Sequence, residues 1–174
     1  MSHYNANLRD IEFCLFDLLG TEKVLGTSIF SELDRETAMG MLEEMKRLTE
    51  NDLAASFVEG DRIGTDFNKA TGDVKLPASF IKSYKAYVDG EWWRLDAPVA
   101  LGGMKVPASI RWAIAEMVLG SNPAIHIYAS GYAFAHVAYM LGTEEQKHMA
   151  KLMVDRHWGA TMQLTEPDAG SDVG

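Results

Sequence analysis

Residues 123–141, PAIHIYASGYAFAHVAYML, constrain the fold more than any other part of the chain. Their only possible charges are those of His126 and His136, and Gly142 follows as a stop signal. A helix that is apolar on all sides is normally buried at the centre of a domain, because a face left in water would lose hydrophobic stabilisation. We therefore expect a helical domain built around one buried central helix.

The rest of the chain is mostly helical in pattern. Apolar residues recur at spacings of three and four, and Gly or Pro residues punctuate the segments. Asp34 is expected to cap a long second helix, and Thr143 and Gln146 to form a capping box. We expect six helices, near residues 8–19, 34–59, 77–90, 107–120, 123–141 and 143–156, with a loop at 61–76.

One short strand is predicted after the last helix. Residues 160–165 alternate loosely between the two sides of an extended chain. A lone strand is not stable, because its backbone N–H and C=O groups need a partner. We therefore expect the rest of its sheet to come from residues outside this sequence or from another chain.

Composition excludes several classes of protein. The 174 residues are 47% hydrophobic, which allows one domain with a sizeable core. The net charge of −9 argues against nucleic acid as a partner, because phosphate binding needs a basic face. Cys14 is the only cysteine, so no internal disulfide can form and a cytoplasmic location is expected.

The sequence has no recognisable targeting, membrane or metal signal. The start, MSHYNANLRD, lacks the basic and apolar regions of a secretory signal. Apolar stretches stay below the ~18 residues that a transmembrane helix needs. His126, His136 and His148 lack the spacing of known metal sites, so we predict no metal.

The stretch TEPDAGSD at 165–172 carries the strongest indication of a binding site. Pro167 fixes its own φ, Gly170 permits a close approach, and Thr165 and Ser171 supply hydroxyl groups. A loop of this kind after a strand can bind a polar ligand through hydroxyls and backbone amides. The residue types alone also fit a well-capped surface turn, which is the more common case.

The order of several motifs resembles that of the acyl-CoA dehydrogenase family. LTEPDAGSD is preceded by WGATMQ and by GTEEQKHMAKLM, and LGGMKVP resembles the family's Gly-Gly loop ahead of the fourth helix. The first residues, with YNANLRDIEF, resemble the N-terminal extension of larger bacterial members. The nearest resemblance is to actinobacterial enzymes that act on fatty acyl-CoA of broad chain length, and it covers essentially the whole chain.

The resemblance implies a division of the chain into three parts. Residues 1–33 correspond to the N-terminal extension and 34–157 to the N-terminal helical domain of the family. Residues 158–174 correspond to the start of a middle β-domain that is truncated at Gly174. The expected fold of this chain is therefore all-α, followed by the first strand of the β-domain.

The resemblance also implies an activity. The family uses FAD to oxidise fatty acyl-CoA to trans-2-enoyl-CoA in β-oxidation: a carboxylate removes the pro-R α-proton and hydride passes to the flavin. The electrons continue to an electron-transferring flavoprotein, and the enzymes are homo-oligomers, either dimers or tetramers. The catalytic glutamate belongs to the C-terminal part of the family, so no catalytic residue is expected in this chain.

Several residues match positions that contact the cofactor or substrate in the family. Thr165 matches a threonine whose hydroxyl touches the isoalloxazine, and Ser171 is the expected substrate contact. Asp168 stands where many members have glycine, and a turn tolerates it. The full set of expected cofactor-binding residues is Met162, Gln163, Leu164, Thr165, Gly170 and Ser171.

Small residues in YASGYAFA at 128–135 suggest a further contact. The matching helix of the family borders the fatty-acyl pocket, where Ala129 would leave depth for a long chain. Close helix packing is the alternative explanation, and it is the one we favour for small residues in general.

Two other functions fit the same sequence. The chain could be a helical interaction module that keeps the scaffold and does no chemistry, which a natural protein ending at Gly174 would favour. It could also belong to an acyl-CoA oxidase, which passes electrons to oxygen. Neither the chain-length preference nor the choice between oxidase and dehydrogenase follows from these residues.

Overall fold

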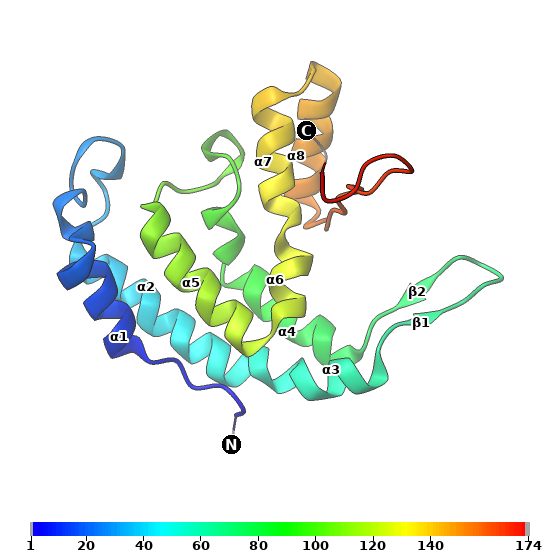
Figure 1. Cartoon of the computed structure of the whole chain (residues 1–174), viewed down its shortest axis with the longest axis horizontal. Helices are drawn as coiled ribbons and strands as arrows, with labels where there is room; N and C mark the ends of the chain where they lie inside the picture. The colour runs from blue at the N-terminus through cyan, green and yellow to red at the C-terminus, as the bar shows by residue number, and fades with distance from the viewer. Residues whose placement is uncertain (1, 173–174) are drawn as a thin grey trace.

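A computed structural model describes residues 2–172 and shows six helical runs (Figure 1). They confirm the all-α class, and several of the runs are subdivided. In chain order the runs are α1 (Leu8–Glu12) with a π-helical segment to Leu18, then α2 (Arg35–Leu48) continued through π and 3-10 turns into α3 (Phe57–Ile63), α4 (Ala78–Asp89), α5 (Ala108–Ser121), α6 (Pro123–Ala129) with α7 (Gly131–Leu141), and α8 (Glu144–Asp155).

The helix ends follow from local capping chemistry, as the sequence predicts. Asp34 accepts a hydrogen bond from the backbone N–H of Thr37 at 2.7 Å and starts α2. Thr143 and Gln146 form a complete capping box at the start of α8. Gly20 has a φ of 63°, in the left-handed region that favours glycine, and it ends the first run.

The core lies between α2 and α5, which run side by side at the base of the molecule (Figure 1). Spacings of three and four place one apolar face of each helix against the other. Each fully buried aliphatic side chain contributes about 1.5–3 kcal/mol by leaving water. The buried residues at this contact are Ala38, Leu42, Met45 and Leu48 from α2, and Ile110, Ile114, Met117 and Val118 from α5.

Two backbone carbonyls in the irregular turns between α2 and α3 accept hydrogen bonds from side chains elsewhere in the domain. Ser83 of α4 donates its hydroxyl to the carbonyl of Asp52 at 2.6 Å. Asn122, between α5 and α6, donates its amide to the Leu53 carbonyl at 3.1 Å and to the Ser56 hydroxyl at 3.0 Å. These contacts are buried, so the backbone of the break keeps partners without water.

The prediction of one continuous buried helix at 123–141 is wrong. The segment forms two helices that meet at Ser130, and α7 pairs with α8 in a hairpin that rises from the helical base (Figure 1). Because α8 covers only one side of α7, Val137, Met140 and Leu141 are 57%, 62% and 84% exposed. Within the described residues, no helix is both long and apolar enough to cross a bilayer.

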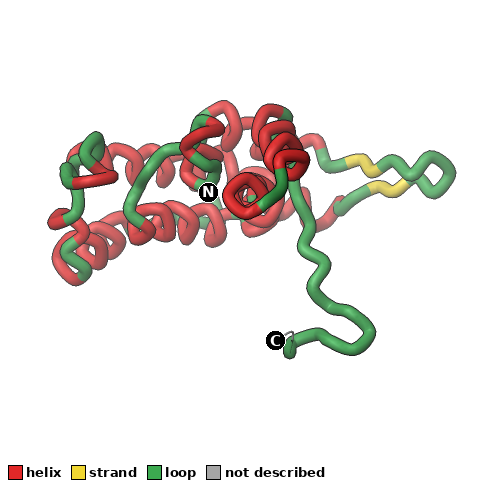
Figure 2. The backbone as a smooth tube through the Cα atoms, turned by 90° about the horizontal axis from the view of Figure 1, so that it is seen from above, coloured by secondary structure: helices red, strands yellow, loops and turns green. Residues whose placement is uncertain are grey.

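The expected loop at 61–76 contains a small hairpin. Strands β1 (Asp66–Phe67) and β2 (Val74–Lys75) pair antiparallel, with Phe67 opposite Val74. The hairpin projects from the end of α3, away from the other helices (Figures 1 and 2). The sequence prediction missed it because each strand has only two residues, too few to show an alternating pattern.

The strand predicted at 160–165 does not form in the described part of the chain. These residues have no regular secondary structure and run away from the helical body (Figure 2). Their backbone has no neighbouring strand among residues 2–172, and a strand without a partner cannot make its ladder of hydrogen bonds.

Candidate functional site

Most of the residues predicted to bind a cofactor lie on the segment that follows α8. Met162, Gln163, Leu164 and Thr165 are all exposed along it, away from the packed helices (Figure 2). Met162 and Leu164 are 64% and 49% exposed, although both are apolar. The structure therefore presents these residues outward, where a ligand or another part of a protein can cover them.

A tight turn brings the remaining predicted residues together. The backbone N–H of Glu166 donates to the Ala169 carbonyl at 2.6 Å, and the Ala169 N–H donates to the Glu166 carbonyl at 3.4 Å. A Cβ at Gly170 would lie 3.7 Å from the side-chain methyl of Thr165. The turn thus places Thr165 beside Gly170 and next to the exposed Ser171.

Ala129 lies apart from this turn. It is the last residue of α6 and is 3% exposed, packed within the core. The two residues before it, Ile127 and Tyr128, are exposed and line a surface cleft instead. The structure does not bring Ala129 to the surface of that cleft, so a substrate contact through Ala129 stays a prediction.

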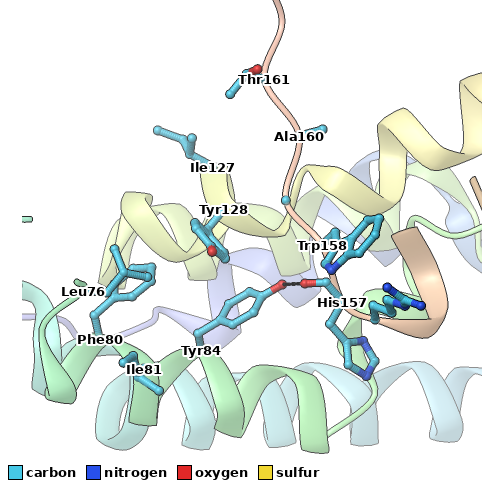
Figure 3. Close-up of a pocket in the computed structure, with 12 residues that line it drawn as sticks. Leu76, Phe80, Ile81, Tyr84, Ile127, Tyr128, His157, Trp158, Ala160 and Thr161 are labelled. Atoms are coloured by element: carbon cyan, nitrogen blue, oxygen red, sulfur yellow. Dashed lines mark hydrogen bonds between the residues drawn. The ribbon is translucent and has the colours of Figure 1, made fainter. Parts of the chain in front are cut away.

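An apolar cleft of about 940 Å³ lies where the segment leaves the helices (Figure 3). Its walls come from α4, from α6 and from the first residues after α8. Carbon atoms of aliphatic and aromatic side chains make up most of its surface, and Arg156 is the charged residue in the lining. The main lining residues are Leu76, Phe80, Ile81, Tyr84, Ile127, Tyr128, Trp158, Ala160 and Thr161.

Three aromatic rings of the cleft pack edge to face. The Tyr128 ring lies 4.9 Å from that of Tyr84 and 5.6 Å from that of Phe80, with interplanar angles of 80° and 79°. Edge-to-face contacts favour a fixed arrangement because the positive edge of one ring meets the negative face of another. These ring contacts join α4 to α6 along the cleft.

His157 occupies an unusual backbone position at the root of the segment. Its φ is 54°, in the left-handed region, where a residue other than glycine typically costs about 1–2 kcal/mol. The His157 N–H donates to the Val154 carbonyl and the Trp158 N–H to the Met153 carbonyl, which is the Schellman pattern that ends a helix. Glycine is the usual residue at this place.

The side chain and carbonyl of His157 both have partners. The Tyr132 hydroxyl lies 2.9 Å from Nδ1 of His157. The Tyr84 hydroxyl donates to the His157 carbonyl at 3.4 Å, a bond that Figure 3 shows. Burial raises the pKa of both tyrosine hydroxyls above the ordinary value. The imidazole also lies 5.9 Å from the Trp93 ring.

Gly131 lets the departing chain cross the start of α7. A Cβ at this position would overlap the carbonyl oxygen of Trp158 and crowd the Cα of Gly159. The absence of a side chain is what permits this close approach of two backbones. Sequence reasoning included Gly131 only among the small residues at 128–135 that favour close packing, and it missed His157. The local signal at His157 was the lack of glycine after the last helix.

The described residues thus form a helical domain with an apolar cleft, and an exposed turn that carries hydroxyl groups follows it in the chain. In sequence, the chain is homologous to acyl-CoA dehydrogenases over its whole length. It is 52% identical over 174 residues to the broad-specificity linear acyl-CoA dehydrogenase FadE5 of Mycobacterium tuberculosis, covering all of this chain and 28% of that protein.

Two further relatives are more distant. The 3-methylmercaptopropionyl-CoA dehydrogenase of Ruegeria pomeroyi is 32% identical over 173 residues, which are 98% of this chain and 29% of that protein. The butyryl-CoA dehydrogenase of Syntrophomonas wolfei is 25% identical over 180 aligned residues, covering all of this chain and 29% of that protein. The chain spans less than a third of the length of each relative. No protein-family model matches it.

Proposed function

We propose that this chain is the N-terminal portion of an FAD-dependent dehydrogenase that converts linear fatty acyl-CoA to trans-2-enoyl-CoA. The observation that carries the proposal is the 52% identity, over the whole chain, to a protein named a broad-specificity linear acyl-CoA dehydrogenase. In this proposal residues 1–33 are an extension, 34–157 the helical domain and 158–174 the start of a β-domain.

The segment after α8 has the chemical groups that one side of a flavin site needs. Among the described residues, no backbone group of 159–165 is hydrogen-bonded to another residue, so its amides and carbonyls can serve a ligand. The Thr165 hydroxyl is exposed at the end of this stretch, and Gly170 leaves room beside it. We propose that Met162, Gln163, Leu164, Thr165, Gly170 and Ser171 hold the flavin on this side, with Ser171 also touching the CoA substrate.

The division of labour follows from this placement. FAD, when bound, supplies the acceptor for the hydride that leaves the substrate. The chain's own residues would orient the flavin through hydroxyl and amide contacts and exclude water with the exposed apolar side chains of Met162 and Leu164. The catalytic glutamate is proposed to lie outside this chain. We also propose that an electron-transferring flavoprotein accepts the electrons from the reduced flavin. The complete protein is proposed to be a homo-oligomer.

The activity can be tested on the complete purified protein. If the proposal holds, the protein is yellow, and anaerobic addition of a linear acyl-CoA bleaches the flavin absorbance with formation of the 2-enoyl product. Transfer of electrons to an electron-transferring flavoprotein without peroxide formation marks a dehydrogenase, whereas peroxide formation in air marks an oxidase. A protein that contains no flavin and forms no enoyl product would refute the proposed function.

Replacing Thr165 tests the flavin contact directly. Thr165→Val keeps the shape and removes the hydroxyl, so FAD is expected to bind about fivefold more weakly, the loss of one ordinary hydrogen bond. The measurement is the dissociation constant of FAD, with the absorbance spectrum of the bound flavin as a second readout. Thr165→Ser keeps the hydroxyl and should retain affinity. Equal weakening by both substitutions would show that the hydroxyl does not contact the flavin.

Enlarging Ala129 tests its predicted place beside the acyl pocket. Because Ala129 is 3% exposed, Ala129→Val is a gentler probe than a larger side chain. If Ala129 borders the pocket, the ratio of kcat/KM for long over short acyl-CoA falls. If Ala129 serves only helix packing, the melting temperature falls and this ratio stays unchanged, which would remove Ala129 from the substrate site.

A further inference from the structure

We infer that His157 is a positioning residue that fixes where and in which direction the segment 158–172 leaves the helical domain. The inference rests on the proposed function, because that segment carries the residues proposed to hold the flavin. Its support comes from three independent observations around His157: its backbone conformation, the contacts of its side chain and carbonyl, and the close crossing at Gly131.

The backbone of His157 adopts a conformation in which glycine is the usual residue. The Schellman hydrogen bonds that end α8 are made by backbone groups alone, and glycine makes them without strain. Histidine at a φ of 54° accepts strain that glycine would avoid. A residue held in a sparsely populated conformation persists when its side chain makes contacts that over-determine it.

Those contacts come from three separate parts of the helical domain. Tyr132 of α7 meets the imidazole Nδ1, Tyr84 of α4 meets the His157 carbonyl, and Trp93 of the 3-10 turn Trp92–Leu95 packs its ring near the imidazole. Tyr84 and Trp93 come from neighbouring elements, and Tyr132 comes from α7, about 40 positions further along the chain. His157 is therefore tied to the body of the domain rather than only to the end of α8.

The crossing at Gly131 fixes the next residues. The Trp158 carbonyl and Gly159 run against the start of α7, so close that only glycine fits at 131. Thr165 lies seven positions after Trp158, and seven steps of extended chain span at most about 25 Å. Anchoring at 157–158 thus limits the positions that Thr165 and the turn can reach, and it sets the direction from which they approach a ligand.

The experiment compares three substitutions in the complete protein. His157→Gly allows the same left-handed backbone conformation without strain and removes the imidazole. Tyr132→Phe removes one hydroxyl and keeps the ring against Trp93, so it is the milder probe. His148→Ala, at an exposed histidine of α8, is the control. For each protein, amide hydrogen exchange is measured without FAD at Trp158, where the segment is hydrogen-bonded to the end of α8, and along α8 itself; the FAD dissociation constant is measured next.

We expect His157→Gly to raise amide exchange at Trp158, whose N–H donates to the Met153 carbonyl, about five- to tenfold while the rest of α8 exchanges as in the unaltered protein. Tyr132→Phe should shift exchange in the same direction by less, and His148→Ala should shift nothing. FAD binding should weaken severalfold for His157→Gly, with a changed spectrum of the bound flavin. A purely structural helix-ending role predicts the opposite, since glycine would then serve as well as histidine or better.

The outcomes separate the inference from the proposed function. Unchanged exchange in His157→Gly overturns the inference, whatever the cofactor result. Raised exchange with unchanged FAD affinity and an unchanged flavin spectrum overturns it as well. The contacts of His157 would then not position the residues proposed to hold the flavin. If the unaltered protein binds no FAD at all, the proposed function fails, and the exchange measurement still decides whether His157 fixes the segment.

Discussion

Replacing Leu42 with alanine is expected to lower the free energy of unfolding by about 3 kcal/mol. Leu42 lies in the middle of α2, is 0% exposed, and faces the core formed with α5. The substitution removes apolar surface that was out of water and leaves a cavity, because close-packed neighbours relax only partly. Urea unfolding of the 174-residue chain, followed by helical circular dichroism, gives the value.

An exposed leucine provides the matched control for Leu42. Leu18, at the end of the first helical run, is 70% exposed, so Leu18→Ala should change stability by less than about 0.5 kcal/mol. The two substitutions remove the same atoms and differ only in their surroundings. Equal effects at both positions would show that α2 does not form the centre of the core.

Replacing Asn122 with alanine is expected to cost about 2 kcal/mol of stability. The Asn122 amide donates to the Leu53 carbonyl and the Ser56 hydroxyl, and all three residues are at most 2% exposed. Removing the amide leaves a buried carbonyl without its main donor at the point where α2 passes into α3. The free energy of unfolding in urea measures the loss.

The loss at Asn122 can be distinguished from the loss of a helix cap. Asn122 is the N-cap residue of α6, yet its side chain makes no capping hydrogen bond. Asn51→Ala is the control, because the Asn51 amide donates to the Arg47 carbonyl in an exposed position where water can replace it. A destabilisation at Asn122 no greater than at Asn51 would contradict the buried role.

The exposed residues of α7 show how a sequence pattern can be misread. Val137, Met140 and Leu141 suggest a buried helix, because apolar residues there occupy every side. Burial, however, depends on which elements surround the helix, and in the described residues only α8 packs closely along α7. The sequence therefore predicted helical structure at 123–141 correctly, but it predicted neither the break at Ser130 nor the exposure of α7.

The candidate site also has one part that the sequence predicted and one part that it did not. The motif at 165–172 pointed to the turn, and the structure brings Thr165 and Gly170 together there. Nothing in the local sequence connects His157 with Tyr132 and Tyr84, which lie 25 and 73 positions away along the chain. Contacts over such distances depend on how helices pack, so a pattern read within one segment cannot contain them.

The amino-acid sequence by itself determined the helix ends that depend on local capping. Asp34, Thr143 and Gly20 act on backbone groups only a few positions away, and such effects are complete within one turn of chain. Tertiary structure alone decided the break at Ser130, the cleft between α4 and α6, and the missing strand at 160–165. The break and the cleft depend on backbone and side chains that are distant in sequence. The strand at 160–165 needs a partner strand, which is absent from residues 2–172.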